Sequence, residues 1–136
     1  MSERIKTAIR RLIDEFWNEK NSGVEDELFA PDAVIYDSGV PLPNLGKEFF
    51  TSIRTAFPDI RVTADDMVAE GDKVALRWTS TGTHRGELQG IPPTNRQVTV
   101  IGITIYRFAG DRIVEEWNNA DTLGMLRQLG VVASSS

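Results

Sequence analysis

The stretch IRVTADDMVAEGDKVALRWTSTGTH, residues 60–84, decides the fold, because apolar side chains recur along it at every second position. Such alternation is typical of β-strands and predicts one strand over residues 60–69 and another over residues 73–84. Gly71 and Asp72, in the connector EGDK, are a signal for a hairpin turn. One face of the second strand is mostly apolar, and we expect it to point inward. That face holds Val74, Leu76, Trp78, Ser80, Gly82 and His84.

The rest of the chain surrounds this hairpin with strands on one side and helices on the other. Residues 96–108 and 112–119 also have the pattern of strands. Apolar residues at helical spacing predict an amphipathic helix over residues 3–20 and a second helix from Phe49 to Phe57. Helices followed by a meander of long strands indicate an α+β domain, with helices on one face of a curved antiparallel sheet. This arrangement can leave a cavity between the two layers.

Several shorter elements are predicted between the helices and at the end of the chain. VEDELF, residues 24–29, is expected to form a helical turn, and a short strand from Ala33 to Tyr36 follows. The loop DSGVPLPNLG, residues 37–46, comes next. A closing helix from Leu123 to Leu129 is capped by Gly130.

The composition is that of an ordinary globular domain. The chain has 136 residues, and we expect one domain over residues 1–130 and a disordered tail over residues 131–136. A net charge of −5 argues against binding to nucleic acid or to an anionic membrane. The lack of cysteine excludes disulfides and thiolate chemistry. The opening MSERIKTAIRR lacks the apolar segment of a signal peptide, so a cytoplasmic location is expected.

The last strand leads into a carboxylate with two candidate roles. Trp117 is the strongest apolar residue of this strand, so its face is expected to point inward, together with Asn119 and Asp121. Asp121 also precedes Thr122 and the closing helix, which makes it a candidate N-cap. The two roles are compatible, although a carboxylate held by backbone N–H groups is a weaker base.

Several short motifs occur in a fixed order over the second half of the chain. They are Phe57-Pro58-Asp59, Gly82-Thr83-His84 with Gly86, Gly90-Ile91-Pro92-Pro93-Thr94 with Arg96, and Trp117 followed by Asp121 and Gly124. Together they resemble the SnoaL-like polyketide cyclase (ester cyclase) family of the NTF2-like superfamily. The resemblance implies an α+β cone, in which a curved antiparallel sheet wraps around N-terminal helices and a deep pocket. It also implies a homodimer or homotetramer, formed through the outer surface of the sheet.

The resemblance further implies an activity and two catalytic residues. Characterised members close a ring of an anthraquinone-type polyketide methyl ester by an intramolecular aldol reaction, without a metal or organic cofactor. The family's general acid/base is an aspartate that matches Asp121, and a pocket histidine matches His84. The reaction needs a group that removes a proton from carbon beside a carbonyl and later protonates an alkoxide. Without the resemblance, His84 would be interpreted as a structural histidine at the end of a strand.

A small hydrophobic or polycyclic substrate calls for an aromatic pocket. His84 or Asn119 is expected to hydrogen-bond the developing enolate oxygen. The residues expected to bind the substrate are Trp17, Tyr36, Phe50, Trp78, Trp117 and Asn119.

Two other functions stay open. A ketosteroid-isomerase-like enzyme shares the superfamily's fold and places its base after the first strand, where this sequence has Asp37. That enzyme takes an oxyanion donor from a tyrosine of its first helix, whereas this helix offers Phe16 and Trp17. A non-catalytic module that binds a small molecule also fits the sequence.

Overall fold

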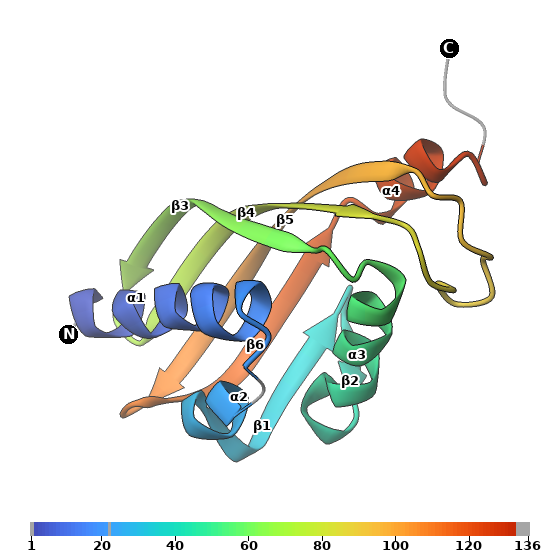
Figure 1. Ribbon diagram of the computed structural model, residues 1–136. Helices are drawn as coiled ribbons and strands as arrows, with labels where there is room; N and C mark the ends of the chain where they lie inside the picture. Colours follow the sequence, from blue (N-terminus) through green and yellow to red (C-terminus); the bar gives the residue numbers. More distant parts are fainter. Residues whose placement is uncertain (1, 22, 133–136) are drawn as a thin grey trace.

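The four long strands predicted from the sequence form most of one sheet (Figure 1). They are β3 (Arg61–Glu70), β4 (Lys73–Thr83), β5 (Gln97–Ala109) and β6 (Arg112–Ala120). Each predicted end lies within about one residue of the observed end, well inside the usual uncertainty of such boundaries. The computed structural model describes residues 2–21 and 23–132. Within them, the expected α+β architecture with a curved sheet is confirmed.

Two further strands extend the sheet beyond β6. β1 (Phe29–Asp37) pairs in parallel with β6, and β2 (Val40–Leu42) pairs in antiparallel with β1, so the order is β2-β1-β6-β5-β4-β3. β1 is longer than the predicted strand, and β2 lies within the predicted loop. The ladder between β1 and β6 is interrupted between Phe29 and Val34. Pro31, which has no N–H to donate, lies in this interruption.

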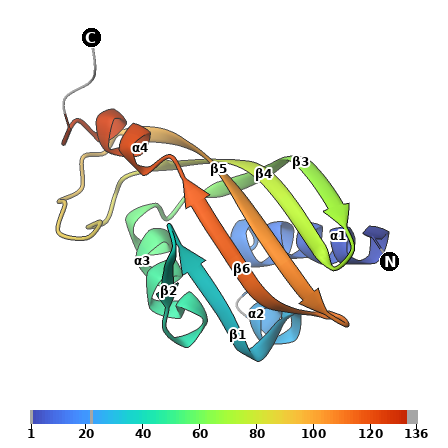
Figure 2. The same cartoon turned by 180° about the vertical axis from the view of Figure 1, so that it is seen from behind.

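The first helix covers one face of the sheet, while the opposite face of β4, β5 and β6 stays open (Figures 1 and 2). The predicted helix over residues 3–20 consists of α1 (Ser2–Arg11) and a π-helix (Leu12–Asn18) that continues it. The other helices are α2 (Gly23–Leu28), α3 (Lys47–Ala56) and α4 (Thr122–Leu129), and a short 3-10 turn, Asn44–Gly46, precedes α3.

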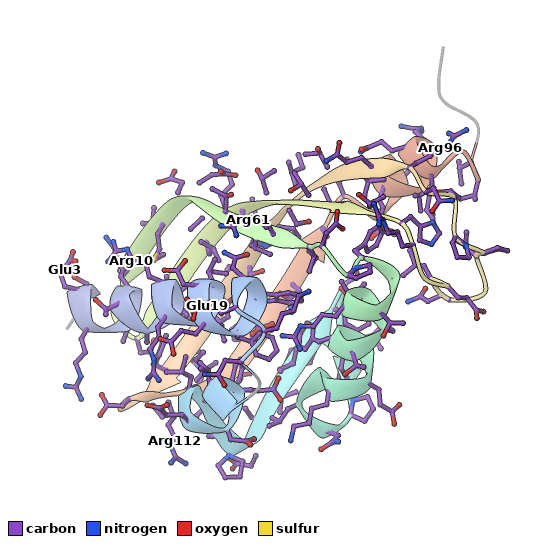
Figure 3. The ribbon with its side chains drawn as sticks, viewed as in Figure 1. Glu3, Arg10, Glu19, Arg61, Arg96 and Arg112 are labelled. Carbon is purple, nitrogen blue, oxygen red and sulfur yellow. The ribbon has the colours of Figure 1, made fainter. Side chains whose placement is uncertain are left out.

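The hydrophobic core lies between the first helix and the sheet. The helical spacing of the apolar residues brings Ile9, Leu12 and Phe16 onto the face that points toward the strands. Charged side chains such as Glu3, Arg10 and Arg112 project outward (Figure 3). The strands contribute a second set of buried side chains to the core: Ile35, Val62, Val74, Leu76, Val98, Phe108 and Ile113.

A β-bulge in β6 reverses the side-chain alternation of that strand. Phe108 of β5 pairs with Ile113, whereas Arg107 pairs with Glu115, so Val114 is the extra residue. One extra residue turns the side chains that follow it onto the other face of the sheet. Glu116 therefore lies inside and Trp117 outside, and the prediction that the Trp117 face points inward was wrong.

Val131 and Val132 follow α4, and the rest of the predicted tail, residues 133–136, lies outside the described residues. No helix in the described part of the chain is both long and apolar enough to span a membrane.

Candidate active site

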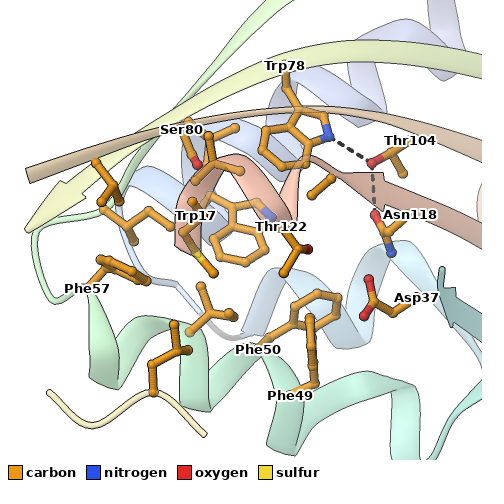
Figure 4. A pocket seen from close by; sticks show the side chains of 18 of the residues that line it. Trp17, Asp37, Phe49, Phe50, Phe57, Trp78, Ser80, Thr104, Asn118 and Thr122 are labelled. Atoms are coloured by element: carbon orange, nitrogen blue, oxygen red, sulfur yellow. Dashed lines mark hydrogen bonds between the residues drawn. The ribbon is translucent and has the colours of Figure 1, made fainter. Parts of the chain in front are cut away.

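An apolar cavity of about 270 Å³ lies between the sheet and the helices (Figure 4). The π-helix contributes Trp17 and α3 contributes Phe49 and Phe50. Strands β3 to β6 form the wall on the opposite side, and α4 and the loop between β4 and β5 complete the enclosure. A small, mostly apolar cavity of this kind is the usual setting of a small-molecule site. Its aromatic wall consists of Trp17, Phe49, Phe50, Phe57, Trp78 and Tyr106.

A chain of hydrogen bonds crosses the wall of the cavity from β4 to β6 (Figure 4). The indole N–H of Trp78 donates to Thr104 Oγ1 over 2.9 Å, and the Thr104 hydroxyl donates to Asn118 Oδ1 over 2.8 Å. The Asn118 amide then donates to Glu116 Oε2 over 2.6 Å and to the carbonyl oxygen of Tyr36 over 3.3 Å. These bonds fix the Asn118 side chain with its oxygen toward Thr104 and its nitrogen toward Glu116.

Glu116 provides a buried carboxyl group at the end of these hydrogen bonds. Only 4% of the residue is exposed. Burial raises its pKa from 4.5 to about 7, partly opposed by the hydrogen bond from Asn118 and assisted by the nearby charge of Glu25. Near neutral pH this side chain is therefore populated both as an acid and as a carboxylate, which suits it to proton transfer.

Asp37 is a second carboxyl group at the cavity and differs from Glu116 in its surroundings. It ends β1 opposite Asn118 in the parallel ladder, and its carboxylate points into the cavity (Figure 4). Partial burial raises the pKa of Asp37 as well. Within the part of the chain that the structure describes, no side chain or backbone group hydrogen-bonds this carboxylate, so it can accept a proton from a bound molecule.

The model of the SnoaL-like polyketide cyclase family matches residues 7–129. This chain belongs to the SnoaL-like polyketide cyclase family. Its fold is accordingly the NTF2-like cone that the sequence motifs implied. A comparison of this SnoaL-like chain with curated proteins gives no match.

Solved structures share the fold over nearly the whole chain. IdmH from Streptomyces antibioticus, described as a candidate polyketide cyclase, is 34% identical with a TM-score of 0.81, and the match covers 92% of this chain and 97% of that one. A candidate polyketide cyclase from Acidithiobacillus ferrooxidans is 32% identical with a TM-score of 0.81, covering 96% of each chain. AclR from Streptomyces galilaeus, described as a candidate hydroxylase, is 27% identical with a TM-score of 0.89, covering 98% and 85%.

The predicted substrate-binding residues of this SnoaL-like chain divide between the two faces of the sheet. Trp17, Phe50 and Trp78 line the cavity. Tyr36 and Trp117 do not line it. They stack on each other across neighbouring strands, with ring centroids 6.0 Å apart and ring planes 3° from parallel. Asn119 has the same strand parity as Trp117 and is also absent from the cavity wall, as the bulge requires.

Asp121 caps a helix. It is exposed, and its carboxylate accepts a hydrogen bond from the backbone N–H of Gly124 over 2.9 Å. The N-cap interpretation is confirmed, while Asp121 is not part of the cavity wall. Its catalytic role stays a prediction.

His84 is fully buried next to the cavity but does not line it. Its Nδ1 accepts the backbone N–H of Thr94 over 3.2 Å, and its ring lies 5.5 Å from that of Phe57. Asp121 and His84, the two catalytic residues that the family resemblance implies, therefore do not meet in the cavity.

The polar cavity residues of the hydrogen-bond chain on β5 and β6 were missed from sequence, namely Thr104, Glu116 and Asn118. Gln89 and Thr122 also line the cavity and were not predicted to do so. The signal from strand parity was weak, because Glu116 and Asn118 share one parity while Glu115 and Asn119, equally polar, share the other. The bulge concealed it, since Ile113 and Trp117 also share a parity and made the other face look like the interior. No group of histidine and acidic side chains among residues 2–21 and 23–132 is suited to hold a metal ion.

Proposed function

We propose that this chain catalyses proton transfer at carbon beside a carbonyl group in a flat, apolar, ketide-type molecule, and that the transfer leads to intramolecular aldol ring closure. The observation that carries the proposal is the presence of two different carboxyl groups, Asp37 and Glu116, in one aromatic cavity. Titratable groups in contrasting environments are the usual basis for separate acid and base roles. Membership of the polyketide cyclase family supports the choice of substrate class.

The proposed step starts at Asp37. Its carboxylate removes a proton from the carbon beside a substrate carbonyl, and protonated Glu116 donates a hydrogen bond to the enolate oxygen that forms. The enolate carbon then attacks a second carbonyl of the same molecule, which forms the new carbon–carbon bond and an alkoxide. The proton held by Asp37 passes to this alkoxide, so the enzyme returns to its starting state.

The aromatic side chains favour a flat substrate. Trp17 and Phe50 meet edge to face, with ring centroids 5.5 Å apart, and both line the cavity. Aromatic rings offer a large apolar contact area with little loss of rotamer freedom, which suits the binding of fused rings. One side of the cavity carries a polar cluster of Asp37, Thr104, Glu116 and Asn118. Ser80, Gln89 and Thr122 add single polar side chains elsewhere on its wall.

Separate substitutions of Asp37 and of Asp121, the base that the motif match predicts, test the proposal. With an aromatic polyketide methyl ester capable of aldol closure, Asp37→Asn should lower kcat by about 10²- to 10⁴-fold, the usual contribution of general acid–base catalysis. The matched control, Asp121→Asn, retains an N-cap side chain and should keep turnover near the wild-type rate. If Asp121→Asn abolishes turnover and Asp37→Asn does not, Asp121 is the base, as the motif match predicts.

A ketosteroid-isomerase-like reaction is the second candidate, and the position of Asp37 favours it. The residue is the last one of the first strand, β1, and it lines the cavity. The same base would move a proton within a β,γ-unsaturated ketone and yield the conjugated isomer. Wild-type conversion of such a ketone, lost in Asp37→Asn, would support isomerisation. Tight retention of both kinds of ligand without any product would instead indicate a binding protein.

A further inference from the structure

The loop of residues 85–95, which joins β4 to β5, forms part of the cavity wall. Leu88 and Ile91 both line the cavity, and their backbones exchange two hydrogen bonds of 3.0 and 2.8 Å. Gln89 and Gly90, between them, have positive φ angles of 46° and 87°. Positive φ at both central residues is the geometry of a tight hairpin turn. We call residues 88–91 the wall turn. It presents two apolar side chains to the cavity on a compact backbone.

The wall turn is anchored to α3 on one side. The backbone N–H groups of Arg85 and Gly86 both donate to the carbonyl oxygen of Ala56, over 2.9 and 3.2 Å. A Cβ atom at Gly86 would lie 2.2 Å from the carbonyl oxygen of Thr55, so a larger residue would push the loop away from the helix. The loop is therefore fixed against the helix that supplies Phe49 and Phe50 to the cavity wall.

The other anchor is His84, at the base of the loop. Its backbone N–H donates to the carbonyl oxygen of Arg96, and its carbonyl oxygen accepts from Asn95, over 2.9 and 2.8 Å. Its side chain adds a third link, because Nδ1 accepts the N–H of Thr94. Nδ1 also lies 3.1 Å from Thr94 Oγ1, a contact in which the ring nitrogen accepts or donates according to its tautomer. Nε2 is buried and has no partner among the described residues.

We infer that the wall turn sets the size of the molecule that the cavity accepts, and that His84 is a positioning residue that holds the turn through Nδ1. The inference rests on the proposal that the cavity binds a flat small molecule. It separates His84 from the chemistry, because the imidazole contacts the loop rather than the cavity. Substitution of Leu88 or Ile91 should then change the affinity for a bulky ring system more than the affinity for a small one.

Truncation of the two apolar side chains of the wall turn tests whether the turn sets the size of the bound molecule. Binding of 2-acetylnaphthalene and of the longer 2-acetylanthracene is followed by tryptophan fluorescence for the wild type, Leu88→Ala and Ile91→Ala. Each truncation should improve binding of the anthracene relative to the naphthalene by about tenfold, the scale on which apolar pockets distinguish small differences in size. The control is Glu87→Ala, an exposed residue of the same loop, which should leave the ratio unchanged. An unchanged ratio in both truncations would overturn the inference.

A pair of substitutions tests His84. Asn places an amide oxygen where Nδ1 lies, whereas Gln places its amide group nearer to Nε2. His84→Asn should therefore keep the wild-type selectivity ratio, and hydrogen exchange at the Thr94 amide should stay as slow as in the wild type. His84→Gln should lose selectivity and exchange that amide faster. If His84→Asn folds and His84→Gln does not, the result would also show that Nδ1 holds the loop. Failure of both variants to fold, or loss of turnover in His84→Asn with its selectivity intact, would contradict the assignment.

The outcomes separate the two proposals. If neither ketone binds the wild type, both fail. If both bind and the truncations leave the ratio unchanged, only the size-selecting role fails. If the ratio changes and Asp37→Asn remains fully active, only the proposed chemistry fails.

Discussion

Glu116 is a carboxyl group that is buried and also lines the cavity. Removal from water raises its pKa from 4.5 to about 7, so between these pH values the folded chain holds a proton that the unfolded chain has lost. Unfolding is then accompanied by proton release, and stability falls as pH rises through this window. The penalty is absent below about pH 4.5 and complete above about pH 7.

Glu116→Gln should remove this pH dependence. A shift from 4.5 to about 7 corresponds to a penalty of about 3 kcal/mol at pH 8, at about 1.4 kcal/mol per pKa unit. The variant keeps an oxygen that can accept from Asn118, so it should be more stable than the wild type at pH 8 and similar to it at pH 4.5. Urea unfolding across this range measures the difference, and Glu70→Gln, at an exposed site, serves as control. A less stable variant at pH 8 would contradict the assignment.

At the scale of elements, α4 links the C-terminal segment to the cavity. It supplies Thr122, Met125 and Leu126 to the wall, and Asp121 caps its first turn. Gly130 ends the helix with a φ of 80°, a left-handed conformation that glycine adopts without strain. The cap therefore supports the site through the helix, without contact with the cavity.

Asp121→Ala should lower the free energy of unfolding by about 1 kcal/mol, the usual cost of losing an N-cap. Asp121→Asn should cost less, because asparagine caps helices about as well as aspartate. Thermal unfolding of the two variants side by side gives the measurement. Equal losses in both would show that the charge, rather than the hydrogen bond to Gly124, stabilises α4.

Sequence periodicity predicts the strands of this protein well because each long strand has one apolar face, as Val74, Leu76 and Trp78 show in β4. It assigns the wrong inward face to β6, where the bulge at Val114 arises from pairing with β5 and leaves no local mark. The short β2 was missed for a similar reason, since only its partner β1 makes it a strand. Motif matching found the fold and the family, but it directed attention to Asp121 and His84, which lie outside the cavity wall.

At the scale of the whole molecule, the outer face of the sheet carries an apolar stripe. Ile101 is 57% exposed and Ile103 53% exposed, and Ile105 lies next to Trp117 across the strand pair. Monomers rarely leave large contiguous apolar patches in water. We propose that a second copy of the chain covers this stripe, as the family resemblance implies.

Ile103→Asp should convert the proposed dimer to a monomer, because it places a charge in the middle of the stripe. Sedimentation velocity measures the change in mass. Thr51→Asp, which adds the same charge on the exposed side of α3, should leave the dimer intact. Ligand binding should persist in the monomer, since the cavity opens on the other face of the sheet. A wild-type chain that sediments as a monomer would refute the dimer.

The bulge at Val114 also has a consequence for how relatives of this protein are compared. A gain or loss of one residue at that point would exchange Glu116 and Asn118 for their neighbours on the cavity side, with no substitution at all. Two homologues that differ only by one residue at that point could match letter for letter along the rest of β6 and still present different chemistry to their ligands. Divergence of activity within this fold can therefore proceed by insertion and deletion, and percentage identity along this strand does not measure it.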